Sequence, residues 1–361
     1  MRSTFDLVVL GCGGGPSEYN LSGYLLKSCD TTWSQGIIAL EAGSGIGALQ
    51  HILRTTPSIF SATFPTAAES HPPPTAADIY SWIQCYLITH AHLDHVNSLV
   101  LSAGSQGASR REVFGLLPTL KDLQMVFSDR LWPNLASWDE NDSSAALLYS
   151  TLQVDGRYKA ISPHISVRTF SVSHGGHKAP YDSATFFIKH NTSGREFLFF
   201  GDVEPDSVAS HPRNLEVWRA VAPKIPIVLS SIFIECSWPT GRADDMLYGH
   251  LSPEHLRDEL VNLATEVMKV RRQQVTEAAS SSASSDKPIR KRLKISPPSP
   301  GSLEGALKGL RVYIIHCKDD LRSTYSEPIN QVIAGQVRAL TDELSLGAEI
   351  ISVEQGMHIT I

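Results

Sequence analysis

The chain has 361 residues, of which 42% are hydrophobic and 19% are charged, a balance that is typical of globular proteins and excludes wholesale disorder. Its 31 lysines and arginines against 37 aspartates and glutamates give a net charge of −6. This charge argues against a general nucleic-acid-binding protein, because such proteins present a basic surface.

Location can be inferred from three further features. No apolar run approaches the roughly 18 residues that a transmembrane helix needs, so we expect no membrane partner. Residues 1–10 lack the long apolar core of a signal peptide. The five cysteines are scattered and include no C-x-x-C pair, which argues against a disulfide framework. We therefore expect an intracellular, cytoplasmic protein.

Strands and helices can be assigned in chain order from the spacing of apolar residues. The first strand is expected at 5–10 and runs into the glycine-rich turn 11–16. Strands and helices do not alternate strictly along the chain, which argues against a doubly wound sheet. Further strands are expected at 22–27, 36–40, 82–88, 165–172, 184–189, 196–200, 227–234, 311–315 and 348–353, and helices at 46–54, 96–102, 214–222, 253–272 and 328–344.

Two segments break this pattern. Residues 66–77 (TAAESHPPPTAA) are expected to form an exposed loop, and residues 273–302, with SSSASS, KPIRKRLK and SPPSPGS, a disordered insertion. The basic octamer 287–294 is either a nuclear localisation signal, which would add the nucleus as a second location, or a solvent-exposed run of charged residues. We expect residues 1–361 to form a single domain that carries this insertion.

Four candidate metal ligands lie within six residues directly after the strand expected at 82–88: His90, His92, Asp94 and His95. On an extended segment, residues two apart point to the same side, so His90 and His92 can approach one metal. Asp94 and His95 lie where a helix begins and can turn toward a second point. This spacing favours two metal ions in one cleft over a four-coordinate structural site.

The H-x-H-x-D-H motif resembles the hallmark of the metallo-β-lactamase superfamily. The resemblance implies an α/β fold, a four-layer αβ/βα sandwich with a binuclear zinc site, whose other ligands follow strand ends. His174, Asp202 and His316 each follow an expected strand. The resemblance thus implies two Zn²⁺ ions, with other divalent metals left open: His90, His92 and His174 on one ion, Asp94, His95 and His316 on the other, and Asp202 bridging.

Glu41 occupies the place where this superfamily usually has the aspartate of a D-A-G sequence. In the family this residue supports a ligand histidine rather than binding the metal. We expect the longer glutamate side chain to do the same.

A narrower resemblance is to the class II cyclic-nucleotide phosphodiesterases. It rests on HLDHVNSLVL at 92–101, LGCGGGP at 10–16, IECS at 234–237 and YGHLSP at 248–253. The family signature normally ends in Ser followed by Ala or Pro, where this chain has Ala103 and Gly104. The resemblance implies hydrolysis of 3′,5′-cyclic AMP to the 5′-nucleoside monophosphate, which ends cyclic-nucleotide signalling, and it leaves open whether cyclic GMP is also a substrate. The partner is then a small molecule and not a nucleic acid, and the oligomeric state stays open.

Hydrolysis also needs a proton for the leaving ribose 3′ oxygen. Related phosphodiester-cleaving members of the superfamily use a histidine steered by a glutamate, and His250 and Glu235 lie at comparable places. The resemblance therefore implies catalytic roles for His250 and Glu235 beside the ligand Asp94, with the carboxylate raising the pKa of His250. The alternative interpretation is that His250 is a turn residue and that Glu235 caps a strand.

Three aromatic residues near the expected site loops, Tyr181, Trp238 and Tyr248, either stack on the base or pack within the protein. The glycine-rich turn 11–16 lacks a nucleotide fingerprint, and is either a bare turn or a loop that approaches the phosphate.

Two other functions stay open. A tRNA 3′-processing endonuclease-like hydrolase would share the metal motifs but would need a basic arm. A non-catalytic zinc-folded regulator would bind metal and hydrolyse nothing, although the full set of ligands argues against it.

Overall fold

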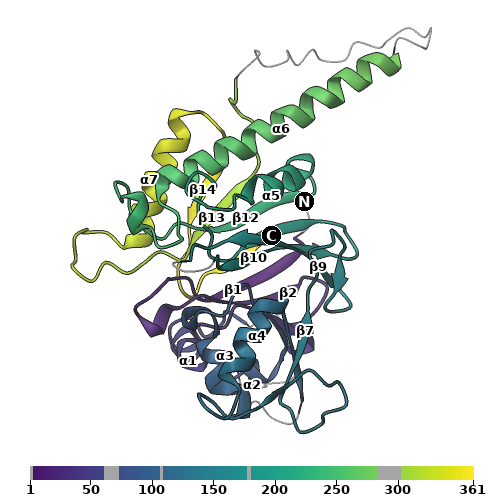
Figure 1. Ribbon diagram of the computed structural model, residues 1–361, viewed down its shortest axis with the longest axis vertical. Helices are drawn as coiled ribbons and strands as arrows, with labels where there is room; N and C mark the ends of the chain where they lie inside the picture. The colour runs from purple at the N-terminus through teal and green to yellow at the C-terminus, as the bar shows by residue number, and fades with distance from the viewer. Residues whose placement is uncertain (1–2, 61–72, 106–108, 177–179, 283–301) are drawn as a thin grey trace.

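The computed structural model describes residues 3–60, 73–105, 109–176, 180–282 and 302–361. Two β-sheets lie face to face, and helices cover the outer side of each sheet (Figure 1). In Figure 1, helices α1–α4 and the purple-to-blue N-terminal strands form the lower half, and α5–α7 form the upper half. This arrangement confirms the expected four-layer sandwich.

The first sheet has eight strands in the order β15-β1-β2-β3-β4-β5-β7-β6. Antiparallel strands at one side, β15, β1, β2 and β3, give way to parallel strands from β3 to β7. The bounds are β1 Phe5–Gly11, β2 Gly23–Ser28, β3 Ile37–Leu40, β4 Ile83–Leu87, β5 Arg111–Gly115, β6 Ala136–Ser137, β7 Leu147–Thr151 and β15 His358–Thr360.

The second sheet repeats this plan with seven strands in the order β14-β13-β12-β11-β10-β9-β8. Strands β8 to β11 are antiparallel, and β11 to β14 are parallel. The bounds are β8 Lys159–Ala160, β9 Ile165–Ser173, β10 Asp182–His190, β11 Glu196–Phe200, β12 Leu229–Glu235, β13 Arg311–Ile315 and β14 Glu349–Ser352.

Seven α-helices cover the described parts of the two sheets. Four pack on the first sheet and three on the second. The bounds are α1 Ile46–Thr55, α2 Ala76–Ser81, α3 Leu93–Ser102, α4 Leu117–Val126, α5 Asn214–Val221, α6 Pro253–Ser282 and α7 Ile329–Glu343.

Three apolar layers hold the sandwich together, one between the sheets and one under each set of helices. The inter-sheet layer contains rings from both sheets, such as Tyr24 of β2, Phe199 of β11 and Phe233 of β12. The Tyr24 and Phe199 rings meet edge to face with centroids 5.3 Å apart, and Phe233 stacks on Tyr313 at 4.5 Å. The strand ends that carry the candidate ligands are therefore fixed by a packed core.

Two expectations about irregular segments need correction. The residues assigned to the start of the insertion, 273–282, instead continue α6, because QQVTEAA favours a helix that has already begun. Ala76 and Ala77, assigned to an exposed loop, form the first turn of α2, which is capped by Thr75, and Ala76 is buried. Residues 66–72, the basic octamer 287–294 and the rest of the insertion up to 301 lie outside the described residues.

Strands and helices between 110 and 162, together with β15, were not anticipated from the sequence. Within the described residues, no helix combines the length and hydropathy that crossing a bilayer requires.

Candidate metal centre

The predicted ligands meet at one edge of the sandwich, and four of them lie just beyond the end of a strand. His90 follows β4, His174 follows β9, Asp202 follows β11 and His316 follows β13. The carboxyl ends of parallel strands in one sheet lie at the same edge, so β11 and β13 bring Asp202 and His316 together although 113 other residues separate them in the sequence. The helix α3 begins at Leu93 and carries Asp94 and His95 in its first turn.

The first group of potential ligands is formed by His90, His92, His174 and Asp202. The His174 Nε2 atom lies 3.2 Å from His92 Nδ1 and 3.6 Å from Asp202 Oδ2, and His90 Nε2 also lies 3.6 Å from Asp202 Oδ2. In a tetrahedral site with Zn–N bonds of about 2.0–2.1 Å, the ligand atoms lie about 3.3 Å apart. The spacing of this group therefore suits a metal ion of that size.

The second group is formed by Asp94, His95, Asp202 and His316. The His316 Nε2 atom lies 3.1 Å from His95 Nε2, 3.2 Å from Asp94 Oδ2 and 3.3 Å from Asp202 Oδ2. The other oxygen of Asp202, Oδ1, lies 3.3 Å from His95 Nε2. Asp202 belongs to both groups, as expected for a carboxylate between two metal ions.

Contacts behind the ligands fix the orientation of their rings. Thr89 Oγ1 lies 3.0 Å from His90 Nδ1, Gly249 O lies 2.8 Å from His174 Nδ1, and Ser237 Oγ lies 3.0 Å from His316 Nδ1. Each of these rings thus has one nitrogen held by the protein and the other, Nε2, directed into a ligand group. Gly249 has a φ of 81°, and a Cβ there would lie 2.7 Å from the His174 carbonyl oxygen, so this close approach requires glycine.

Glu41 lies where the sequence places it, behind the second group. Its Oε2 atom is 3.6 Å from His95 Nδ1, and it is almost fully buried. Its backbone φ of 59° lies in the left-handed region, a strained conformation for a residue other than glycine.

The donor set fits a metal in a second, independent way. His90 Nε2 and His95 Nδ1 are buried without a hydrogen-bond partner among the described residues. Leaving a buried polar atom unsatisfied costs about 1–3 kcal/mol, and a metal ion in the first group would satisfy His90 Nε2. Burial also lowers the pKa values of His90, His92 and His316, and that of His174 to about 3, so these rings are neutral and can donate a lone pair.

His95 differs from the other ligand histidines. Burial disfavours its charged form, but the carboxylates of Asp202 and Glu41 outweigh burial and raise its pKa well above the usual value. Burial disfavours the ionised form of Asp202, but its interactions with His316, His95 and His90 outweigh burial and lower its pKa well below the usual value, so its carboxylate is ionised.

A third cluster joins His250 and Glu235 to His174 and Asp202. His250 Nδ1 lies 2.9 Å from Glu235 Oε1 and 3.7 Å from Asp202 Oδ2. Glu235 Oε1 also accepts the backbone N–H of Val203, and Oε2 accepts the hydroxyl of Ser237. Glu235 therefore both orients His250 and ties neighbouring loops to the end of β12.

The net shift in the pKa of His250 is opposite to the expected increase. Burial, with His250 only 6% exposed, outweighs the neighbouring carboxylates and lowers the pKa of the ring to about 4. Burial, followed by the charge of Asp202, raises the pKa of Glu235 to about 7. Both partners thus favour their neutral forms.

The aromatic residues near the site serve different roles. Tyr181 stacks on the ligand His92, with centroids 4.7 Å apart and planes 6° apart, and its hydroxyl lies 3.3 Å from the backbone N of Ala91. Trp238 lies under the Arg242 guanidinium at 3.6 Å, whereas Tyr248 is 56% exposed. Tyr181 and Tyr248 line a pocket of about 300 Å³ that opens beside His92 and His174.

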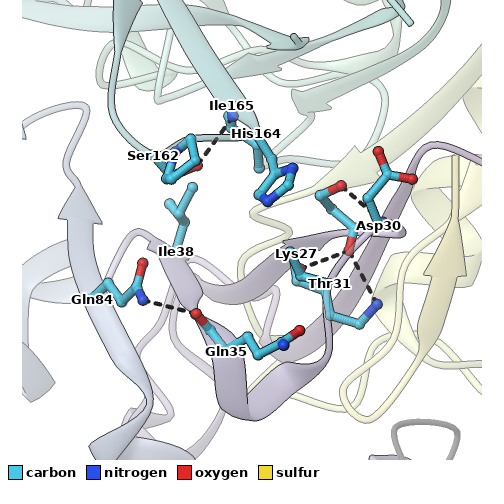
Figure 2. Close-up of a pocket in the computed structure, with 12 residues that line it drawn as sticks. Lys27, Asp30, Thr31, Gln35, Ile38, Gln84, Ser162, His164 and Ile165 are labelled. Carbon is cyan, nitrogen blue, oxygen red and sulfur yellow. Dashed lines mark hydrogen bonds between the residues drawn. The ribbon is translucent and has the colours of Figure 1, made fainter. Parts of the chain in front are cut away.

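A separate pocket of about 310 Å³ lies at the opposite ends of the strands (Figure 2). Lys27, Gln35, Gln84 and His164 are among the residues that line it, and Gln84 Nε2 donates to the Gln35 carbonyl at 2.9 Å. The 9 residues of β9, about 30 Å in length, separate His164 from His174. This pocket contains none of the candidate ligands.

Comparison with known proteins decides the family. The family model described as "cAMP phosphodiesterases class-II" matches residues 10–356. The chain belongs to this family. A 3′,5′-cyclic-nucleotide phosphodiesterase of Schizosaccharomyces pombe is 34% identical over 280 residues, which cover 74% of this chain and 77% of that protein. One of Aliivibrio fischeri is 30% identical over 356 residues, which cover 98% and 92%.

Solved structures agree with this assignment. Unliganded yeast PDE1 superposes on this class-II phosphodiesterase with a TM-score of 0.77 over 100% of both chains, at 25% identity. The metallo-β-lactamase fold protein YhfI of Bacillus subtilis gives a TM-score of 0.55 at 11% identity, over 99% of this chain and 100% of that one, which supports the fold alone. The resemblance to the class-II family is confirmed, and so is the metallo-β-lactamase-like fold that the motif implied.

All the predicted site residues of this phosphodiesterase lie together in the structure. Further residues contact them that were given no role at the site from the sequence, although Tyr181 was noted as an aromatic residue near a site loop. Among them are Thr89, Gly249, Ser237, Tyr181 and Lys318. Ser237 follows Glu235 in the IECS stretch, and Lys318 follows the ligand His316 by two residues. Proximity in the sequence to a predicted site residue could have marked Ser237 and Lys318, but not Tyr181.

Proposed function

We propose that this phosphodiesterase hydrolyses 3′,5′-cyclic AMP to 5′-AMP at two Zn²⁺ ions. The observation that carries the proposal is the pair of ligand groups that share Asp202, in a chain of the class-II family. His90, His92 and His174 would hold one ion, and Asp94, His95 and His316 the other. We propose cyclic GMP as a second substrate, because a Dictyostelium discoideum relative named for both nucleotides is 25% identical over 317 residues.

A cyclic phosphodiester carries one negative charge and has a poor leaving group. Zinc ions bound in both groups would neutralise charge on the phosphoryl oxygens and lower the pKa of a water molecule at the site. The chain's own contribution is to hold the ligand atoms at fixed separations, with Asp202 ionised between the groups. Thr89, Gly249 and Ser237 keep the ligand rings from turning.

We assign His250 as the residue that moves a proton to the ribose 3′ oxygen. Its Nδ1 is held by Glu235 at 2.9 Å, which leaves Nε2 to exchange a proton with water and substrate. With its pKa lowered to about 4, the ring is neutral before reaction. In our scheme Nε2 takes the proton that the attacking water loses and gives it to the leaving oxygen, so hydrolysis consumes one water and leaves the pair unchanged.

The compartment that we propose is the cytoplasm. All five cysteines are free thiols, and four of them are buried, which suits a reducing environment. A fluorescent fusion of the full chain would test the location.

The central experiment uses the purified full chain with cyclic AMP, cyclic GMP and bis(p-nitrophenyl) phosphate, together with a metal count by inductively coupled plasma analysis. We expect 5′-AMP as the product and close to two zinc ions per chain. A chain that retains two zinc ions and cleaves none of the three substrates would be a metal-folded regulator, and the proposal would be wrong.

A further inference from the structure

A lysine lies at the rim of the metal centre with no role in binding the metal. Lys318 follows the ligand His316 by two residues, and its backbone N–H donates to Ser237 O at 3.0 Å. Its Nζ donates to the carbonyl oxygen of Gly14 at 2.6 Å and lies 3.8 Å from Asp94 Oδ2. The ammonium is thus fixed between the glycine-rich turn and the second ligand group.

The glycine-rich turn is shaped to make this contact. A Cβ at Gly14 would lie 2.6 Å from His316 Cε1, so only glycine lets the backbone pass directly over the ligand ring. Gly14 N also donates to Cys317 O at 3.0 Å. The turn therefore places a carbonyl oxygen, Gly14 O, where it anchors Lys318 beside the site.

The Lys318 ammonium keeps donor capacity for an external ligand. An ammonium has three N–H donors, and within the described residues its nitrogen makes one side-chain hydrogen bond, to Gly14 O. The separation of 3.8 Å from Asp94 is too long for a second one. The side chain is 20% exposed, so a bound molecule can reach the remaining donors.

Charge indicates what kind of ligand Lys318 would bind. Among the described residues, Lys318 is the only lysine or arginine that pairs with a carboxylate of the centre, that of Asp94. Its ammonium presents a positive charge and further N–H donors at the rim of the centre, which suits an anionic group of a bound molecule.

We propose that the Lys318 ammonium binds a non-bridging phosphoryl oxygen of the cyclic nucleotide and of its 5′-monophosphate product. This inference rests on the proposed function of the site. Lys318 would hold the substrate and counter its charge, and it would take no part in proton transfer or metal binding.

The test compares an anionic and a neutral ligand on the metal-loaded full chain. Affinity for 5′-AMP and for adenosine is measured by calorimetry for the unmodified chain, Lys318→Met, Lys318→Arg and Lys308→Met. Lys308 is exposed and serves as a control for the loss of one positive charge. Metal content and the KM for cyclic AMP are measured on the same samples.

We expect Lys318→Met to weaken 5′-AMP binding roughly 10- to 100-fold, as for the loss of a hydrogen bond to a charged group. The KM for cyclic AMP should rise by a similar factor, while adenosine affinity and metal content stay as in the unmodified chain. Lys318→Arg should recover most of the affinity, and Lys308→Met should behave as the unmodified chain.

Three results would overturn the inference: unchanged 5′-AMP affinity in Lys318→Met, an equal loss for adenosine, or loss of metal. In a chain that hydrolyses cyclic AMP, any of them overturns the role of Lys318 alone. Failure of the unmodified chain to hydrolyse cyclic AMP overturns the proposed function and this inference together.

Discussion

Replacing His250 by alanine separates proton transfer from metal binding. Removal of the ring leaves Glu235 with hydrogen bonds from the backbone N–H of Val203 at 2.9 Å and from the hydroxyl of Ser237 at 2.7 Å. The buried carboxyl group therefore keeps hydrogen-bond partners. His250 is absent from the two groups that share Asp202 with the H-x-H-x-D-H ligands. We therefore expect His250→Ala to fold and to retain its zinc.

The expected loss of activity follows from how firmly the ring is held. His250 is buried and bonded to a fully buried carboxylate, so its orientation is fixed before the substrate arrives. A positioned acid or base contributes roughly 10²–10⁴-fold, which corresponds to about 3–5 kcal/mol of activation free energy. We expect a decrease of this size in kcat for cyclic AMP.

The assay compares cyclic AMP with bis(p-nitrophenyl) phosphate, because nitrophenolate leaves without a proton. Attack on the aryl ester still requires the water to lose a proton, which bound zinc would favour, but its leaving group needs none, so His250→Ala should slow the aryl ester far less than cyclic AMP. His164→Ala, in the pocket of Figure 2 at the far end of β9, is the matched control and should leave both rates unchanged. An equal decrease for both substrates would refute the proton-transfer role, and loss of zinc would assign His250 to the metal instead.

Three further predictions concern the metal and the insertion. Asp94→Ala removes a carboxylate that lies 3.2 Å from His316 Nε2. Zinc content should therefore decrease, and cleavage of every phosphodiester should be lost. Full metal content together with full activity would contradict the two-ion centre. Metal uptake at pH 7 should release at least one proton, because the raised pKa of His95 keeps this ring protonated in the metal-free chain. The affinity for the metal should therefore increase with pH. Calorimetry in two buffers of different ionisation enthalpy measures this release, and an absence of release would show that His95 is already neutral. Replacing residues 283–301 by a short Gly/Ser linker should change turnover by no more than a few-fold, since the distal part of α6 leads away from the sheets (Figure 1). A large loss of activity in a folded variant would instead place that segment at the site.

The ligand set was predictable because most of its information is local. The H-x-H-x-D-H motif places four ligands within six residues, whereas His174, Asp202 and His316 were assigned through strand ends and family resemblance. The contacts of Tyr181 could not be predicted in the same way. Tyr181 is 90 residues from Ala91, and only the packing of β10 beside the motif brings its ring onto His92.

Burial was the quantity that the sequence did not reveal. The sign of the shift in the pKa of His250 depends on its exposure of 6%, which follows from the loops that enclose it. The length of α6 is a similar case. The serine-rich composition after 279 suggested an irregular segment, but helix propagation from Pro253 continues through Ser282 at little cost.

The separation of the ligands along the chain has a consequence for synthesis of the protein. The second group joins residues 222 positions apart, Asp94 and His316, whereas the first group is complete once Asp202 has been made. A chain that stops after α6 therefore has the residues to hold one metal ion but cannot assemble the second group. In the two-ion centre that we propose, hydrolysis would require that β13 has been synthesised and has docked beside β12, whereas a product that ends after α6 would have only the ligands of the first group.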